Sequence, residues 1–216
     1  MKKYFNIFII LGMISFILFL LLLILLNVDK SATLTGEVGL SHLNNLVQYK
    51  YNKTWQIVGN IFLYVGIALF ILLVGLGIYQ LIKRKSLFSV DKYILTIGVF
   101  FIVLVLFWLL FDKLVVINNR PILVDEKMEP SFPSTHTLLV VFIYLSAYTV
   151  VINLTNNKMY QNIVLCLAIT ISLIVSISRV LAGMHYITDV LGGILLGLAL
   201  FFLSFGLSLN NKKIEE

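Results

Sequence analysis

Polar residues of the types that carry out acid–base and nucleophilic chemistry gather in three stretches of an otherwise apolar chain. In one of them, His185 and Asp189 are four residues apart, so on a helix they would share a face one turn apart. A carboxylate next to an imidazole fixes its tautomer and stabilises its cationic form. The pair is therefore the orienting half of a nucleophile or general-base arrangement. Gly183, just before it, would let one helix end, so that His185 lies near the start of the next.

A second stretch, Pro133-Ser134-Thr135-His136, has the composition of a helix start. Pro and Ser are frequent at such positions, and the free N–H groups there bind phosphate oxygens. We expect both side-chain capping by Ser134 and anion binding. His136 would donate a proton to a leaving oxygen.

Positive charge is available near these stretches from Lys113, Arg120 and Arg179. The planar guanidinium of Arg presents a fork of donors that suits phosphate oxygens. Three cations, two helix starts and two histidines fit a phosphoryl group better than a neutral substrate.

A metal site is the weaker alternative. The two histidines and Asp189 would form a two-histidine, one-carboxylate set, but three nearby cations would repel a divalent ion. Asp125, Glu126 and Glu129 lie in a predicted loop and suit a solvated surface better than a magnesium site. We therefore expect neither a metal nor another cofactor.

The composition determines which elements position these residues. Of 216 residues, 60% are apolar and 12% are charged, and the mean hydropathy is +1.03. Soluble domains average roughly 45–50% apolar residues and about 25% charged residues. This excludes a water-soluble globule and a disordered chain. The single cysteine, Cys166, excludes an intrachain disulfide and a Cys-rich zinc site. We predict an all-α polytopic membrane protein with one domain, residues 1–216, and the motifs within 113–189.

Six segments are long and apolar enough to cross a bilayer core, which takes roughly 20 residues. They span residues 5–26, 57–82, 93–111, 137–154, 162–181 and 186–209. The first resembles a signal peptide at its Lys2-Lys3 start, but its apolar run is too long and no cleavage site follows, so we predict an uncleaved helix.

We expect a multi-pass protein of the plasma membrane. The distribution of Lys and Arg favours an orientation with both termini in the cytoplasm and the polar stretches at the outer face. A net charge of +6 has this topological explanation, and no basic stripe points to nucleic acid. In the longest loop, residues 27–56, the apolar residues Val38, Leu43, Leu46 and Val47 recur at roughly helical spacing. This pattern fits a short helix on the membrane surface or an ordinary connecting loop.

The three stretches resemble the signature of the type 2 phosphatidic acid phosphatases, a family of lipid phosphate phosphatases. Its pattern is Lys-x6-Arg-Pro, then Pro-Ser-Gly-His, then Ser-Arg-x5-His-x3-Asp. The first and third motifs match at every fixed position, and the second has Thr135 in place of Gly. Thr is stiffer than Gly, so phosphate binding would suffer if the loop required a positive φ; we expect activity to be retained.

The resemblance implies a role for each matching residue. His185 would be the nucleophile that forms a phosphohistidine, Asp189 would orient it, and His136 would be the general acid. Phosphate would be held by Lys113, Arg120, Ser134, Arg179 and the backbone amide of Thr135. The family needs no metal.

The expected substrate is a phosphorylated membrane lipid, because its tail can stay in the bilayer while its headgroup enters a basic pocket. The resemblance implies three candidates, because bacterial members of the family act on undecaprenyl pyrophosphate, phosphatidylglycerophosphate or phosphatidic acid. Undecaprenyl pyrophosphate ranks first on topology alone. Two alternatives are a catalytically weak protein that binds lipid phosphate and a small anion transporter. The sequence does not indicate an oligomeric state.

Overall fold

The computed structural model describes residues 2–33, 35–123 and 128–209. Its helices are α1 (Lys2–Leu25), α2 (Ser41–Asn44), α3 (Lys53–Arg84), α4 (Lys92–Leu109), α5 (Thr135–Leu154), α6 (Lys158–Leu181) and α7 (Ile187–Leu209). A 3₁₀ turn, η1 (Leu87–Ser89), precedes α4, and a π turn, η2 (Leu110–Leu114), extends it. Strands β1 (Ser31–Thr33) and β2 (Gly36–Val38) form an antiparallel hairpin.

The six predicted spans are confirmed as six long apolar helices of a multi-pass membrane protein. Their ends lie within a few residues of the predicted ones. The largest differences are at the starts of α3 and α6, which begin four residues earlier than predicted. For α3 the cause is Asn52, whose side-chain oxygen accepts hydrogen bonds from the N–H groups of Thr54 and Trp55 and so caps the helix.

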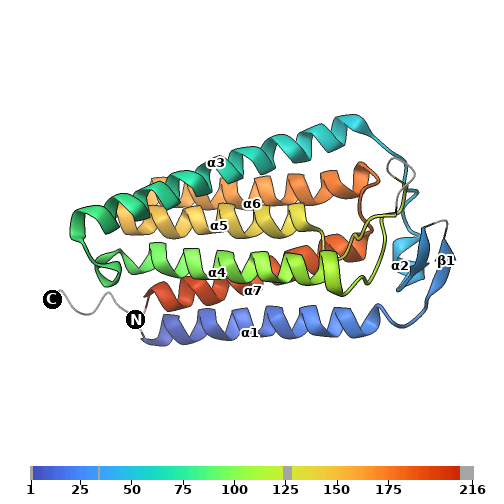
Figure 1. Ribbon diagram of the computed structural model, residues 1–216, viewed down its shortest axis with the longest axis horizontal. Helices are drawn as coiled ribbons and strands as arrows, with labels where there is room; N and C mark the ends of the chain where they lie inside the picture. The colour runs from blue at the N-terminus through green and yellow to red at the C-terminus, as the bar shows by residue number, and fades with distance from the viewer. Residues whose placement is uncertain (1, 34, 124–127, 210–216) are drawn as a thin grey trace.

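The six helices run roughly parallel and antiparallel to one another (Figure 1), and α5 and α7 are the most buried of them. More than half of the apolar window of each of these two is buried, against a third or less in the others. Helix α7 packs on α1, α4 and α5, while α5 also packs on α3 and α6. A side chain at Gly193 would come within 2.7 Å of Ser134 O, so this glycine allows α7 to lie directly against the start of α5.

The segment before α3 does not form a surface helix, which was one of the two structures that its sequence fits. It holds the β1–β2 hairpin and the single turn α2, and the remainder connects these to α3. The apolar residues do not share a face, since Val38 is buried in β2 and Leu46 is 74% exposed. The other reading of this segment, a connecting loop, is the better description.

An even number of spans places the start of α1 and the end of α7 at the same end of the bundle (Figure 1). The α1–α3 segment, the α4–α5 loop and the α6–α7 turn all lie at the opposite end (Figure 1). The three polar stretches therefore meet there.

Candidate active site

His185 lies in the turn between α6 and α7. Helix α6 ends at Leu181, and Gly183 follows with a left-handed φ of 72°, which reverses the chain at little steric cost. A side chain at Gly183 would also lie 2.7 Å from Lys50 O. The predicted role of Gly183 is confirmed, and His185 comes two residues before α7 starts.

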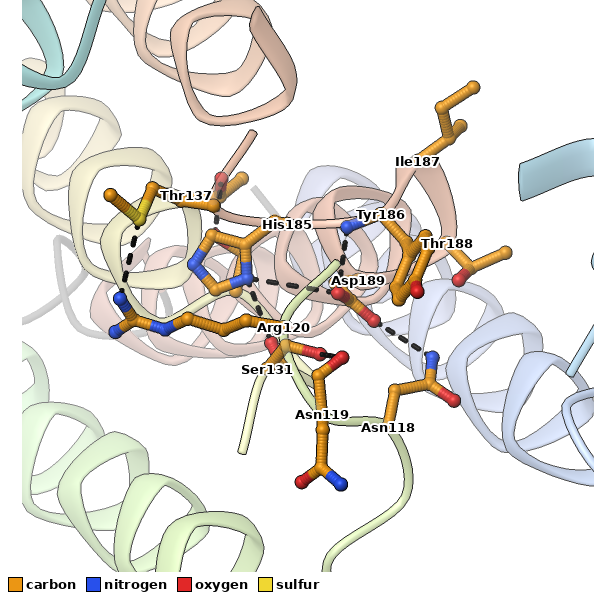
Figure 2. A network of polar contacts seen from close by, with 12 residues as sticks. Asn118, Asn119, Arg120, Ser131, Thr137, His185, Tyr186, Ile187, Thr188 and Asp189 are labelled. Atoms are coloured by element: carbon orange, nitrogen blue, oxygen red, sulfur yellow. Dashed lines mark hydrogen bonds and ion pairs between the residues drawn. The ribbon is translucent and has the colours of Figure 1, made fainter. Parts of the chain in front are cut away.

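The ring of His185 is buried and held through Nδ1. That atom lies 3.0 Å from Ser131 O and 3.8 Å from Asp189 Oδ2. Figure 2 marks both contacts with dashed lines. A carbonyl only accepts hydrogen bonds, so Nδ1 carries the proton and Nε2 carries the lone pair. Nε2 has no hydrogen-bond partner among the residues that the structure describes. The ring therefore has the tautomer of a nitrogen nucleophile.

Asp189 is fully buried in the first turn of α7. Its Oδ1 accepts a hydrogen bond from Asn118 Nδ2 at 3.0 Å, and its Oδ2 accepts one from the backbone N–H of Tyr186 at 2.9 Å (Figure 2). Its own carbonyl accepts from Ser134 N at 2.9 Å. Asp189 thus joins the start of α5, the start of α7 and the loop before α5.

Two segments of the loop before α5 pair with each other beside His185 and Asp189. Asn119 and Pro130 form an antiparallel bridge, flanked by a hydrogen bond from Ser131 N to Asn118 O at 2.9 Å. The pairing brings the Asn118 amide to Asp189 and the Ser131 carbonyl to His185. Neither residue was predicted as a site residue, although both lie in the loop that carries Arg120.

The N-cap side chain of α5 does not bond to the backbone N–H groups of the helix start. Ser134 is the fully buried N-cap residue, but its hydroxyl makes no capping bond and instead accepts from Thr137 Oγ1 at 3.1 Å. The predicted side-chain cap is therefore wrong, because Thr137 engages the hydroxyl.

Thr135 does not strain the backbone here. The non-glycine residues with positive φ, among those described, are Asp29, Leu40 and Lys85. Thr135 is the first residue of α5 and is half-buried. The loop conformation does not require the glycine that the family motif has at this position.

Two arginines enter the site with unpaired donors. Arg179, only 2% exposed, reaches the side-chain oxygen of Asn60 with one Nη at 3.4 Å. Arg120 pairs with Glu129 at 2.9 Å and contacts the sulfur of Met184 at 3.3 Å. The Nε atoms of both arginines are buried without a hydrogen-bond partner in the described part of the chain. Buried donors without acceptors are costly, and an anion bound here would supply the acceptors that these two atoms lack.

His136 and Lys113 differ in how they relate to this cluster. His136 Nε2 lies 3.1 Å from Asn60 Oδ1, the same oxygen that Arg179 approaches. Lys113 lies in η2, its side chain is 71% exposed, and its Nζ pairs with Asp112 at 2.7 Å. The structure records no contact from Lys113 to another predicted site residue, so its phosphate contact stays a prediction.

The surroundings of His185 favour its neutral form. Burial lowers the pKa of the imidazole below 6.5, Asp189 raises it, and the positive charges of Arg179 and Arg120 lower it further. The net pKa shift is downward, so Nε2 has its lone pair available near neutral pH.

No group of three or more His, Cys, Asp or Glu side chains that could hold a metal occurs within residues 2–33, 35–123 and 128–209. Of the loop carboxylates considered in the sequence, Glu129 forms an ion pair with Arg120. Asp125 and Glu126 lie outside the described residues.

Comparison with known proteins supports the resemblance seen in the motifs. A sequence model of the PAP2 superfamily matches residues 12–213. Phosphatidylglycerophosphatase B of Bacillus subtilis is 40% identical over 87 residues; the chain spans only 43% of that protein's length, and the match covers 40% of this chain.

Among solved structures, the crystal structure of a transmembrane PAP2-type phosphatidylglycerolphosphate phosphatase from Bacillus subtilis has the same fold. The TM-score is 0.65 at 24% identity, and the match covers 94% of this chain and 98% of that one. The family match, which extends over nearly the whole chain, shows that this protein belongs to the PAP2 superfamily.

Proposed function

We propose that the protein hydrolyses a phosphate ester or diphosphate on a membrane lipid through a phosphohistidine, without a metal. The observation that carries the proposal concerns the guanidinium Nε atoms of Arg120 and Arg179, in the same site as His185. Both are buried and have no hydrogen-bond partner within residues 2–33, 35–123 and 128–209. His185 has Nδ1 bound to the Ser131 carbonyl, and Nε2 has no hydrogen-bond partner among the described residues. This combination supplies an anion site and a nucleophile together.

In the first step, His185 Nε2 forms a bond to phosphorus while the bond from phosphorus to the lipid oxygen breaks. His136 gives its proton to that oxygen, so the lipid leaves as a neutral alcohol or as a lipid monophosphate. The imidazolium that develops on His185 keeps its Nδ1 proton directed at Ser131 O and is stabilised by the nearby carboxylate of Asp189.

In the second step, water attacks phosphorus and the nitrogen–phosphorus bond breaks. His136, now neutral, accepts the proton of the water, which restores both histidines. Arg120, Arg179 and the amide N–H of Thr135 would hold the equatorial phosphoryl oxygens in both steps, because donors fixed in a buried site need no reorganisation when charge develops. Ser134 adds a hydroxyl at the same helix start.

The names of the relatives favour phosphatidylglycerophosphate as the first substrate to test. Both the curated relative and the solved structure carry this activity in their names. Undecaprenyl pyrophosphate is the second candidate, because we propose that the end of the bundle with the site faces outside. Phosphatidic acid is the third.

Phosphate release by purified protein in detergent with EDTA tests the proposal. The three lipids are offered in parallel to the wild type, to His185→Ala and to His42→Ala, which removes an exposed histidine outside the site. We expect release by the wild type and His42→Ala and none by His185→Ala. Binding of the lipids without release would support the weak binding protein, and the absence of both would contradict a lipid-phosphate site.

A further inference from the structure

Helix α3 contributes to the site although it carries none of the three motifs. Its Asn60 lies three residues inside the predicted span 57–82, where a polar amide is unfavourable unless it has partners. Its side-chain oxygen lies 3.1 Å from His136 Nε2 and 3.4 Å from an Nη of Arg179. Asn60 therefore connects the proposed general acid, on α5, to a phosphate-binding arginine, on α6.

Close packing of α3 makes this reach possible. A side chain at Gly59 would lie 2.7 Å from Ser178 Oγ and 3.3 Å from an Nη of Arg179. On the other side, Tyr144 of α5 donates a hydrogen bond to the carbonyl of Phe62 at 2.8 Å. These contacts hold the outer part of α3 against both helices that carry the partners of Asn60.

The chemistry of the partners determines which way the amide faces. An arginine Nη can only donate a hydrogen bond, so the atom of Asn60 that it approaches is the oxygen. The same oxygen faces His136 Nε2, and an oxygen can only accept. His136 Nε2 must then carry a proton, whether the ring is neutral or cationic.

We propose that Asn60 is a positioning residue that holds His136 as its Nε2–H form, so that Nδ1 is the nitrogen that exchanges a proton with the leaving oxygen and with water. This inference rests on the proposed function. In the cationic ring both nitrogens carry protons, and Nδ1 gives its proton to the leaving oxygen as the phosphorus–oxygen bond breaks. The neutral ring that remains is the Nε2–H tautomer that the Asn60 oxygen already accepts from, so no rearrangement is needed before water attacks.

Leaving-group dependence tests the inference. Two phosphate monoesters with the same alkyl tail are compared, one of a primary alcohol and one of a nitrophenol, which leaves without being protonated. Asn60→Leu should lower kcat at least about tenfold for the alcohol ester, as loss of effective general-acid catalysis does, and much less for the nitrophenyl ester. His136→Gln should show the same difference between esters. Asn60→Asp, which keeps an acceptor oxygen, should retain more kcat for the alcohol ester than Asn60→Leu.

The matched control is Gln56→Leu. Gln56 lies one turn away on α3, and its side-chain oxygen accepts a hydrogen bond from Tyr51 instead of a site residue. Gln56→Leu should leave kcat unchanged for both esters. If Asn60→Leu lowers kcat equally for both esters, or lowers it for neither, the inference is overturned.

A spectroscopic readout keeps the inference separate from the proposed function. In protein labelled with nitrogen-15 histidine and assigned with His42→Gln and His185→Gln, the neutral His136 ring should show a proton on Nε2 in the wild type. Asn60→Leu should lose this preference while unfolding at the temperature of the Gln56→Leu control. An Nδ1–H ring in the wild type would overturn the inference even if the enzyme is active, whereas an inactive wild type with an Nε2–H ring would refute only the function.

Discussion

The carboxylate of Asp189 is oriented by Asn118, because its hydrogen bonds come from Asn118 and the backbone and not from His185. At 3.8 Å it is an ion-pair neighbour of the imidazole, while its hydrogen bonds come from Asn118 and the Tyr186 N–H. Asn118 therefore fixes the orientation of this carboxylate. We expect Asn118 to act through Asp189, as a positioning residue that does not touch the substrate.

Removal of this amide should slow turnover without unfolding the protein. A hydrogen bond to a charged group contributes about 1.5–3 kcal/mol, so Asn118→Leu should lower kcat roughly 10- to 100-fold. Asn119→Leu is the matched control, because Asn119 bonds to Thr35 O at 2.8 Å and not to Asp189. Steady-state phosphate release from the best lipid measures both, and a wild-type rate in a folded Asn118→Leu would refute this role.

The His185 ring should stay neutral below pH 6.5, because burial and the two arginines lower its pKa. Nitrogen-15 NMR of the ring should show a proton on Nδ1 and a midpoint below 6.5. Because the unfolded chain binds this proton more readily, the free energy of unfolding should decrease as pH falls below 6.5. A midpoint above 6.5, or an Nε2–H ring, would contradict the described environment.

Site residues could be predicted from the sequence where they belong to one of the three motifs. His185, Asp189, His136, Arg120 and Arg179 all lie at one end of the bundle because spacing and helix ends placed them there. Asn60, Asn118 and Ser131 were missed for physical reasons. Ser131 acts through its backbone carbonyl, which any residue has, and Asn60 contributes from a helix distant in sequence. An amide inside an apolar span was the available signal for Asn60.

The segment between α1 and α3 fastens the start of α7. Asn44, fully buried in α2, donates hydrogen bonds to Gly39 O at 2.9 Å and to Thr188 Oγ1 at 3.1 Å. Its side-chain oxygen accepts one from Thr188 N at 3.2 Å. Beside it, the Tyr49 hydroxyl accepts a hydrogen bond from Ile187 N at 3.3 Å, and burial raises the pKa of this phenol to about 12, so it stays uncharged.

Loss of this attachment should loosen the turn that holds His185. Asn44→Leu leaves buried groups of Thr188 and Gly39 unpaired, at about 1–3 kcal/mol each, so the free energy of unfolding and kcat should both fall. Asn45→Leu, at an exposed neighbouring position, should change stability within about 0.5 kcal/mol. Unfolding in detergent with parallel assays compares them, and equal stability of the two variants would refute the attachment.

Long helices were predictable because bilayer thickness and apolar length determine them. The outer segment was not, since its structure depends on tertiary contacts such as those of Asn44 and on turns that hydrophobic spacing does not reveal. The sequence also did not reveal that α5 and α7 are the most buried helices, because lipid-facing and buried spans are similarly apolar. Gly193 and the adjacent Gly192 were the available hints of close helix packing.

In the whole molecule, the site lies at the end of the bundle opposite the start of α1 and the end of α7. We expect the site end to face outside. In a Cys166→Ala background, which removes the one native thiol, Leu46→Cys at the site end should react with an impermeant maleimide in intact cells. Phe88→Cys, 96% exposed between α3 and α4, should react only after permeabilisation. The reverse pattern would show the opposite orientation.

Trapping of the covalent intermediate tests the proposed chemistry most directly. Protein mixed with lipid that carries radiolabelled phosphate is quenched in alkali during turnover, and the labelled peptide is identified. We predict a label that is stable in alkali, labile in acid and attached to His185, absent from His185→Ala and lost on a chase with unlabelled lipid. Turnover with no label on His185, or with label on Ser134 instead, would contradict the phosphohistidine mechanism.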